Sequence, residues 1–311
     1  MEKSGRLLIV GGTGFIGRNV AIEAVNRRFQ VSIISKNNCP KLKQVKGIEY
    51  IAVDITKKKD LLIKLKGKLF DYVLNLGGYV NHANLSNGGD EVFNVHFNGT
   101  KNLVNYIDKS NLKAFIQIGS SDEYGGNTAP QNENQRELPI SPYSFAKVAS
   151  THFLQMLYRT EGYPVVILRP FLVYGPEQDD NRFIPQIIKG CLSNDKFSVS
   201  HGEQFRDFCY IDDVVDAIFL SIKSGGCFGN VINIASGKAI SIKEVIKIIQ
   251  KIIGCGDPQF GQISSRPGEN QRLYADISMA KKLLNWNPKI ALKDGLERVI
   301  KLQQTNIKRM H

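Results

Sequence analysis

Cysteine is scarce in this chain. Its 311 residues include five cysteines, at positions 39, 191, 209, 227 and 255. Their odd number and wide scatter fit neither a disulfide framework nor a metal site, so the sequence predicts a reducing, cytoplasmic environment. The five histidines are also scattered, with no His-x-x-x-His pair, and we therefore expect no metal ion.

Long apolar runs and acidic residues are also in short supply. No run reaches the roughly 18 residues that a membrane span needs, and residues 1–6 leave no room for a signal peptide before the first apolar segment. Lysine and arginine number 41 against 29 acidic residues, a net charge of +12. The lysines gather in stretches such as 57–59 and 64–68 without interleaved aromatics. A solvated basic face that attracts an anionic substrate is therefore favoured over nucleic-acid binding.

A glycine-rich turn stands near the N-terminus. The apolar run 7–10 is typical of a strand buried on both faces, and it leads directly into Gly11, Gly14 and Gly17. Glycines at this spacing allow a tight turn, close backbone approach to a phosphate and close helix–strand packing. The amphipathic pattern that follows predicts a helix, and the N-terminus of this helix would face the phosphate. The segment predicts a dinucleotide-binding site.

Apolar runs and helical patterns alternate through the first half of the chain. Strands are expected at 6–10, 31–35, 49–53, 72–76, 114–119 and 165–169, with helices at 14–26, 60–66, 92–110 and 142–160 between them. This order predicts an α/β fold with a Rossmann-type, doubly wound parallel sheet.

Beyond residue 170 the regular alternation fades. Loop-rich sequence is expected to about residue 200, then a helix at 211–223, a strand at 231–235 and helices around 245–253 and 277–284. We expect residues 1–170, with about 205–235 returning, to form the dinucleotide-binding domain. Residues 171–204 and 236–311 would form a smaller C-terminal α/β lobe that binds the substrate.

Tyr143 and Lys147 are the strongest candidates for catalysis. Ser141 is a good N-cap and Pro142 suits the first helical position, so a helix is expected to start here. Four residues apart, the two side chains share one helix face. A nearby ammonium group favours the phenolate, and we expect it to lower the pKa of the Tyr143 phenol from about 10. The pair could then move a proton at a substrate oxygen.

The glycine turn together with Tyr143-x-x-x-Lys147 resembles the extended short-chain dehydrogenase/reductase family, whose nucleotide-sugar members are epimerases, dehydratases or reductases. Segments 118–125, 169–176, 206–213 and 266–269 resemble further family motifs, and the likeness spans nearly the whole chain. It implies a nucleotide-diphosphate sugar as substrate and a homodimer formed through the Tyr143 helix. The cofactor contacts that we expect are Gly11, Thr13, Gly14, Phe15, Ile16, Gly17, Ser35, Lys36, Asp54, Ile55, Leu76, Gly77, Gly78, Tyr143, Lys147, Pro170, Phe171 and Val173.

The resemblance also implies roles at the reacting centre. Tyr143 would exchange the proton of a sugar hydroxyl while a hydride passes between nicotinamide C4 and the sugar carbon. Lys147 would hold the nicotinamide ribose, and Ser120 would support the charge that develops on the sugar oxygen. Ser121 is expected to contact the substrate. Two arginines, Arg206 and Arg266, would clamp the diphosphate.

Two positions depart from the family pattern. His96 replaces an asparagine that members commonly carry before Gly-Thr, and its role stays open. At the end of the second strand, NAD-dependent members typically place an aspartate for the ribose hydroxyls. Here Ser35 and Lys36 stand in that place, and a hydroxyl donor beside a positive charge suits a 2′-phosphate. NADP is therefore favoured, with NAD as the alternative.

The reaction itself depends on the serine segment. In the dTDP-glucose dehydratases that this family resembles, an Asp-Glu pair follows the catalytic Ser/Thr, whereas GDP-mannose dehydratases have Ser-Glu. This chain has Ser121 followed by Asp122, one candidate acid–base group, which keeps the dehydratase option open. The segment more closely resembles that of 4-keto-6-deoxy-hexose reductases. We expect a nucleotide-sugar 4-ketoreductase, with a 4-epimerase or 4,6-dehydratase that retains NAD as the alternative. A non-catalytic NAD(P)-binding sensor or scaffold is the remote alternative. The nucleotide and the sugar cannot be predicted.

Overall fold

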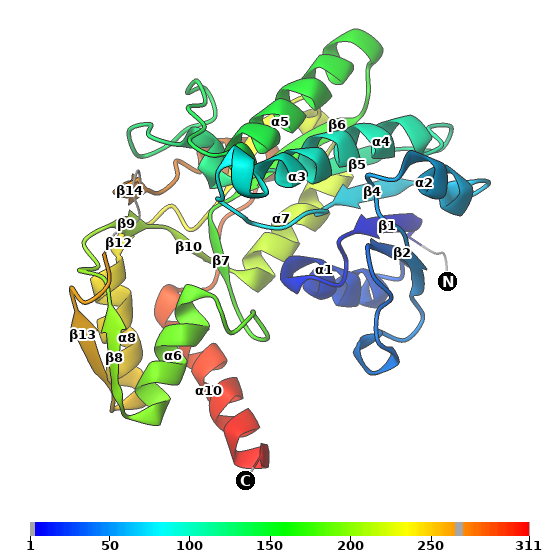
Figure 1. Cartoon of the computed structure of the whole chain (residues 1–311). Helices are drawn as coiled ribbons and strands as arrows, with labels where there is room; N and C mark the ends of the chain where they lie inside the picture. Colours follow the sequence, from blue (N-terminus) through cyan, green and yellow to red (C-terminus); the bar gives the residue numbers. More distant parts are fainter. Residues whose placement is uncertain (1–3, 265–269, 311) are drawn as a thin grey trace.

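A seven-stranded parallel sheet forms the centre of the protein (Figure 1). A computed structural model describes residues 4–264 and 270–310. Across the sheet the strand order is β11-β6-β5-β4-β1-β2-β3, and every neighbouring pair is parallel. The strands are β1 (Arg6–Val10), β2 (Gln30–Ser35), β3 (Glu49–Ala52), β4 (Tyr72–Asn75), β5 (Ala114–Ile118), β6 (Val165–Pro170) and β11 (Val231–Ile234).

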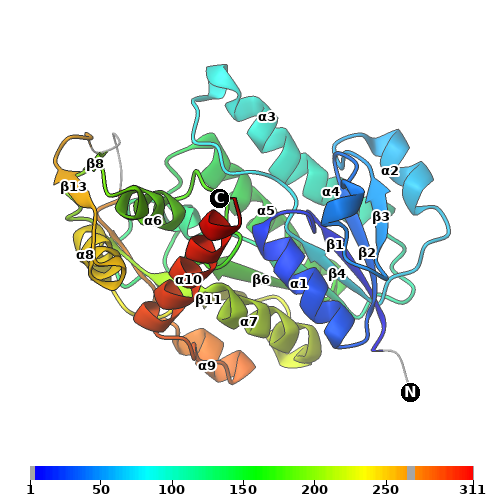
Figure 2. The ribbon, with the colours of Figure 1, turned by 90° about the horizontal axis from the view of Figure 1, so that it is seen from below.

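Helices cover both faces of this sheet, as the alternation along β1 requires. Successive strand residues point to opposite faces. Leu7 and Ile9 join a core with α1 (Phe15–Asn26) and α7 (Ile211–Lys223), which pack side by side (Figure 2). Leu8 and Val10 join a second core with α2 (Lys58–Leu65), α4 (Gly99–Tyr106) and α5 (Pro142–Glu161). The prediction of a doubly wound Rossmann-type sheet is confirmed.

The helix expected at 92–110 is divided into three parts. A short helix α3 (Gly89–Phe93) is followed by one π-helical turn η3 (Asn94–Asn98) and then by α4. In the π turn the His96 carbonyl accepts hydrogen bonds from the hydroxyls of Thr100 and Ser150. These two side-chain donors offer the backbone an alternative to the regular helical pattern.

The remaining elements build smaller sheets beside the main one (Figure 1). Residues 171–200, expected to be loop-rich, instead contain two strands and a helix, so that expectation was wrong. The elements are β7 (Leu172–Tyr174), α6 (Phe183–Ser193), β8 (Lys196–Val199), β9 (Phe205–Arg206), β10 (Phe208–Tyr210), β12 (Ile240–Ser241), α8 (Ile242–Ile253), β13 (Asp257–Phe260), β14 (Arg272–Leu273), α9 (Ser278–Leu284) and α10 (Leu292–Met310). The division into a cofactor domain and a substrate lobe stays a prediction.

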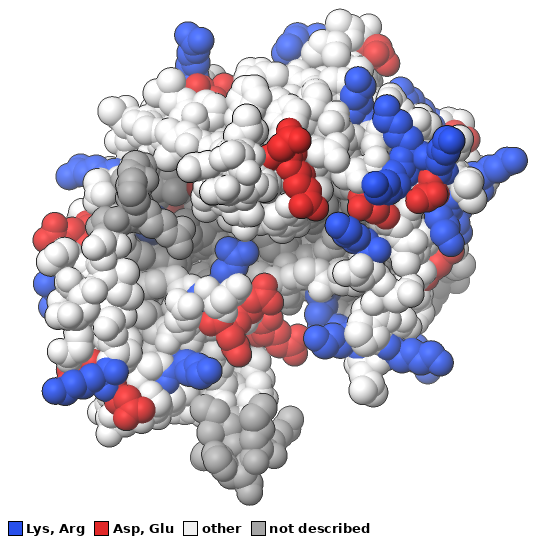
Figure 3. All heavy atoms as spheres, in the orientation of Figure 1, with Lys and Arg blue, Asp and Glu red and all other residues white. Residues whose placement is uncertain are grey.

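The sheet topology determines where a ligand would bind. The chain turns in opposite directions from β1 to β2 and from β4 to β5, so the carboxyl ends of β1 and β4 flank a switch point. The face seen in Figure 3 is hollowed in its middle, while lysines and arginines gather on the side where α2 lies. Among the described residues no helix is long and apolar enough to cross a membrane.

Candidate active site

Gly11 and Gly17, in the turn between β1 and α1, leave no room for a side chain. A Cβ on Gly17 would lie 2.4 Å from the Gly11 carbonyl oxygen, and one on Gly11 would lie 2.8 Å from the Leu76 carbonyl oxygen. Gly11 also has a φ of +78°. Gly14 precedes α1 and supplies no side-chain cap, so the first backbone N–H groups of the helix stay available to an anion. Thr13, at the turn, is exposed, and the cradle fits a pyrophosphate.

The end of β2 bears on the choice of cofactor. Ser35 donates its hydroxyl to the Asn37 carbonyl at 2.8 Å. The Lys36 ammonium lies 3.7 Å from Asp54 and 3.9 Å from Glu91, with most of its side chain in solvent. Asp54 accepts hydrogen bonds from Thr56, and these bonds together with Lys36 hold the pKa of its carboxyl below the usual range despite partial burial. The carboxylates of Asp54 and Glu91 therefore neutralise the positive charge of Lys36, which had suggested a site for a 2′-phosphate.

The turn after β4 lies directly beside the glycine turn. Leu76 is hydrogen-bonded to the Val10 carbonyl, at the end of β1. Ile55, expected as an adenine contact, is buried against Gly77, where a Cβ would come 3.1 Å from it. Gly78 has a φ of +124°, and a Cβ there would collide with the His96 ring. The predicted residues of this turn therefore lie together at the switch point.

Ser120 follows β5 and is held by a capping box. Its hydroxyl accepts the N–H of Asp122 at 3.1 Å, while the Glu123 carboxylate accepts the Ser120 N–H at 2.8 Å. This Ser-x-x-Glu pattern starts the short 3₁₀ helix η4 (Ser121–Tyr124), in which Ser121 is buried. The Ser-x-x-Glu spacing is present in the sequence, but we did not identify it as a capping box there.

Helix α5 brings Tyr143 and Lys147 to Ser120. The helix begins at Pro142 behind the capping residue Ser141, as predicted. Both site side chains are almost fully buried. The Lys147 ammonium donates to the Ile118 carbonyl at 2.8 Å, at the end of β5, and lies 5.9 Å from the centre of the Tyr143 ring. Three residues distant in sequence therefore meet at one strand end.

Burial dominates the protonation of these groups. The pKa of the Tyr143 phenol is raised, first by burial and then by the Asp122 carboxylate, and a hydrogen bond with Ser120 opposes the shift. Burial lowers the Lys147 pKa to about 8, against the attraction of Glu123 and Asp122. The expected lowering of the Tyr143 pKa is therefore wrong for the protein alone, because burial and the Asp122 carboxylate outweigh the groups that favour the phenolate. In the protein without cofactor, the Tyr143 phenol therefore keeps its proton.

Asp122 faces a histidine that the sequence analysis missed. His82, in the loop after β4, places Nε2 3.6 Å from Asp122 Oδ2. Its ring meets the Tyr143 ring edge-on, with centroids 5.6 Å apart. Desolvation raises the pKa of the Asp122 carboxyl, and the positive charges of His82 and Arg206 oppose that shift. No spacing signal could have found His82, because the loop fold alone brings it to Asp122.

His96, the departure from the family pattern, is buried beside the same tyrosine. Its Nε2 lies 2.9 Å from the Tyr79 carbonyl oxygen, and its ring centre is 5.1 Å from that of Tyr143. Burial, followed by repulsion from Lys147, lowers the His96 pKa to about 3. The imidazole is therefore neutral at physiological pH.

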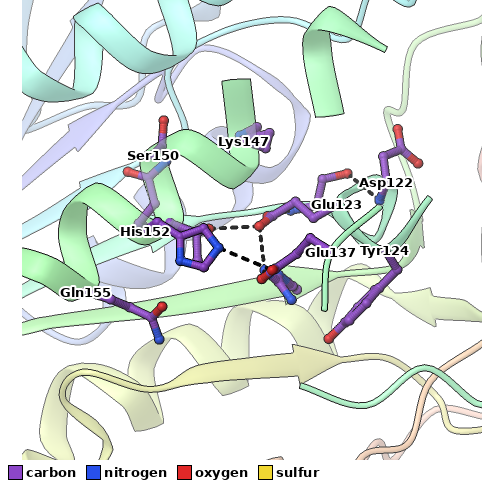
Figure 4. A network of polar contacts seen from close by, with 12 residues as sticks. Asp122, Glu123, Tyr124, Glu137, Lys147, Ser150, His152 and Gln155 are labelled. Atoms are coloured by element: carbon purple, nitrogen blue, oxygen red, sulfur yellow. Dashed lines mark hydrogen bonds and ion pairs between the residues drawn. The ribbon is translucent and has the colours of Figure 1, made fainter. Parts of the chain in front are cut away.

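A buried charge network supports the serine segment from behind. Arg169 on β6 lies 2.7 Å from Glu123 and 2.6 Å from Glu137, and neither Arg169 nor Glu123 has any exposed side-chain surface. Thr151 of α5 donates to Glu123 at 2.8 Å. Figure 4 shows His152 and Glu137 at one end of this network and Asp122 at the other. The network joins β6, η4 and α5, the three elements that position the site.

The other predicted residues lie around this centre or outside the described part. Pro170 ends β6, Phe171 is buried against the Tyr124 ring, and Val173 is half-buried in β7. Arg206 is buried and donates to the Phe205 carbonyl. Arg266 lies outside the described residues. Within 4–264 and 270–310, no cluster of three His, Cys, Asp or Glu side chains could hold a metal ion.

Comparisons with known proteins agree with this geometry. The model of the NAD dependent epimerase/dehydratase family matches residues 7–235. A putative UDP-glucose 4-epimerase of Methanocaldococcus jannaschii is 29% identical over 96% of this chain and 99% of its own. The dTDP-D-glucose 4,6-dehydratase of Mus musculus is 28% identical over 97% of this chain and 89% of its own. A solved UDP-glucuronic acid 4-epimerase from Bacillus cereus, in complex with UDP-glucuronic acid and NAD, is 29% identical with a TM-score of 0.85, over 98% of this chain and all of that one.

Proposed function

We propose, from the premise that this chain belongs to the NAD dependent epimerase/dehydratase family, that it oxidises C4 of a nucleotide-diphosphate hexose and later returns the hydride to the same sugar. The convergence of Ser120, Tyr143 and Lys147 beside the glycine turn carries the proposal. A proton-transfer group, a cation and a hydroxyl donor at one strand end are the parts that alcohol oxidation requires.

Each residue has a defined task at the sugar. The Tyr143 phenol exchanges the proton of the C4 hydroxyl, with Ser120 hydrogen-bonded to the same oxygen. Lys147 holds the nicotinamide ribose, and the positive charge that arrives with the oxidised cofactor offsets the burial that raises the Tyr143 pKa. When bound, NAD accepts the hydride from C4 and stores it for return.

NAD fits the cofactor site better than NADP. Lys36 lies between Asp54 and Glu91, and two carboxylates beside it would repel a 2′-phosphate. Ser35 directs its hydroxyl to the chain itself. The similar Bacillus cereus enzyme was solved in complex with NAD. The expectation of NADP loses its support at these contacts, and we propose retained NAD.

The substrate that we propose is a sugar linked to UDP or dTDP, the nucleotides named for the relatives. Arg206 would bind the diphosphate, and Arg266 keeps the same predicted role without structural support. The named relatives are 4-epimerases and a 4,6-dehydratase, which favours a recycled cofactor over the 4-ketoreductase that was expected first. A non-catalytic sensor is disfavoured because the complete catalytic set is assembled.

A homodimer through α5 also remains a proposal. Phe145 is 53% exposed on α5 and stacks on Phe93 of α3, with ring centres 5.7 Å apart. Met156 and Tyr158 on the same helix are more than a third exposed. An apolar surface of this kind suits a second copy of the helix pair. The cytoplasmic location stays a prediction.

The first experiment is to denature the purified protein and identify the released cofactor, then to incubate native protein with UDP-glucose or dTDP-glucose. We expect released NAD and a converted sugar without net cofactor consumption. Net consumption of NADPH with a 4-keto sugar would instead restore the reductase. The Tyr143→Phe variant should keep the cofactor and lose turnover by at least about 100-fold, the usual contribution of a general acid–base group. Unchanged turnover in this variant would remove Tyr143 from the mechanism.

A further inference from the structure

We propose that Glu123 is a positioning residue that holds the Ser120 hydroxyl and the Tyr143 phenol in register with each other. The inference rests on the C4 oxidation proposed above, in which both groups act on the same sugar oxygen. It gives a functional task to a carboxylate that lies behind the reacting groups and has no exposed side-chain surface. It also gives a task to Thr151, a completely buried residue to which the sequence analysis assigned no role.

The two carboxylate oxygens of Glu123 hold different parts of the site. Oε1 accepts the backbone N–H of Ser120 at 2.8 Å. Oε2 accepts the hydroxyl of Thr151 at 2.8 Å and the Nη2 group of Arg169 at 2.7 Å. A carboxylate is a rigid planar group, so its two oxygens cannot move independently. Glu123 therefore joins the serine segment after β5 to helix α5 and to strand β6 (Figure 4).

Helix α5 meets the serine segment along one side. Tyr143, Lys147 and Thr151 follow each other at intervals of four residues, so their side chains lie on the same side of the helix, and all three are buried. Each reaches the chain that follows β5. The contacts are Tyr143 with Ser120, Lys147 with the Ile118 carbonyl and Thr151 with Glu123. The last contact is two turns from the reacting phenol, and it fixes the position of the helix along the segment.

The same contacts orient the Ser120 hydroxyl. Glu123 holds the backbone N–H of Ser120, while Ser120 Oγ accepts the N–H of Asp122 at 3.1 Å. A hydroxyl that accepts from the backbone still has its own hydrogen to donate. That hydrogen stabilises the sugar oxygen only when Ser120 and Tyr143 both stay within hydrogen-bond distance of it. Fixing the serine and the tyrosine helix to one carboxylate meets this requirement.

Arg169 compensates the buried charge of this carboxylate. Its Nη2 lies between Glu123 and Glu137, at 2.7 and 2.6 Å. Hydrogen bonds to a charged acceptor are shorter and stronger than those to a neutral one. The N–H of Ser120 and the hydroxyl of Thr151 are therefore held more firmly than a neutral amide would hold them, and the ion pair with β6 keeps the acceptor itself in place.

Thr151→Val tests the inference, because valine has the shape of threonine without its hydroxyl and leaves the ion pair of Glu123 with Arg169 in place. With UDP-glucose and dTDP-glucose as the probes, we expect kcat to fall at least about tenfold, while KM and the NAD content of the purified protein stay at wild-type values. Thr151→Ser keeps the hydroxyl and should restore most of the lost kcat. Thr160→Val is the matched control, because it removes an exposed hydroxyl of the same helix that donates to the Met156 carbonyl.

A second measurement does not depend on turnover. In cofactor-free protein, hydrogen–deuterium exchange of a peptide that covers residues 118–125 reports the protection of the Ser120 N–H, which Glu123 holds. Exchange in this peptide should be faster in Thr151→Val than in wild type, because the carboxylate has lost its contact with α5. The Thr160→Val control should exchange as wild type does.

The outcomes separate this inference from the proposed function. Wild-type kcat in Thr151→Val would overturn it, and so would a loss of kcat that Thr151→Ser does not restore or that Thr160→Val shares. Unchanged exchange in Thr151→Val would show that Glu123 does not couple the serine segment to α5, and would leave C4 oxidation intact. Wild-type protein that carries no NAD and converts neither nucleotide sugar would refute the proposed function, and the task of Glu123 at the sugar with it.

Discussion

The buried ammonium group of Lys147 should lower the free energy of unfolding of the protein. Its ammonium group is almost completely buried, and burial lowers its pKa from 10.5 to about 8. This lowering of the pKa by roughly 2.5, at about 1.4 kcal/mol per pKa unit, corresponds to about 3.5 kcal/mol against the folded state at pH values where both states are protonated. Lys147→Met removes this penalty but also removes the hydrogen bond to the Ile118 carbonyl, worth about 1 kcal/mol. The variant should therefore be more stable by about 2.5 kcal/mol at pH 7.

The dependence on pH identifies the cause. Between pH 8 and 10.5 the unfolded chain still binds the proton that folded Lys147 has lost, so the unfolded state binds more protons and wild-type stability rises with pH. The advantage of Lys147→Met should be complete below pH 8 and shrink across that window. Urea unfolding of cofactor-free protein at several pH values measures it. Lys59→Met, on the exposed side of α2, removes the same charge without burial and is the control.

A constant difference between Lys147→Met and wild type from pH 7 to 10 would refute this reasoning. So would a variant less stable than wild type at pH 7, because the hydrogen bond and the neighbouring carboxylates would then outweigh desolvation. Turnover should be lost in either case, since Met cannot bind the nicotinamide ribose. A more stable but inactive variant would show that the site is maintained at the expense of stability.

Two further predictions concern the supports of the site. Glu123→Gln leaves the guanidinium of Arg169 buried with one carboxylate fewer, and should lower the free energy of unfolding by about 3–5 kcal/mol in urea titrations; a loss below about 1 kcal/mol would contradict a stabilising role. Gly17→Ala places a methyl group 2.4 Å from the Gly11 carbonyl and should weaken NAD binding at least about tenfold by calorimetry. Gly226→Ala, which meets nothing within 4 Å, should bind NAD as wild type does.

Local signals explain how much of the fold could be predicted. The glycine turn and the start of α5 depend on backbone geometry and capping, which neighbouring residues determine, and both lie where the sequence placed them. The sheet followed from continuous apolar runs between helical patterns. The stretch after Pro170 was misjudged because its strands are two to four residues long and carry little periodicity of their own.

Only those parts of the site that belong to local sequence motifs could be predicted; contacts between residues far apart in the sequence could not. Ser120, Tyr143 and Lys147 could be proposed from the sequence because each belongs to a recognisable segment, and the structure brings them close together. The contact of Arg169 with Glu123 joins residues 46 positions apart and depends on the packing of β6 against η4. The direction of the Tyr143 pKa shift was missed for a related reason, because spacing reveals a neighbouring charge but not the depth at which the pair is buried.

Charged groups from different elements surround Tyr143. Lys147 is anchored to the backbone on one side, at the end of β5, where a cofactor ribose would lie. Asp122 and His82, both partly exposed, lie 3.6 Å apart, and the His82 ring meets the Tyr143 ring edge-on. Tyr143 therefore has a cation anchored to the backbone near it and a histidine–carboxylate pair beside its ring.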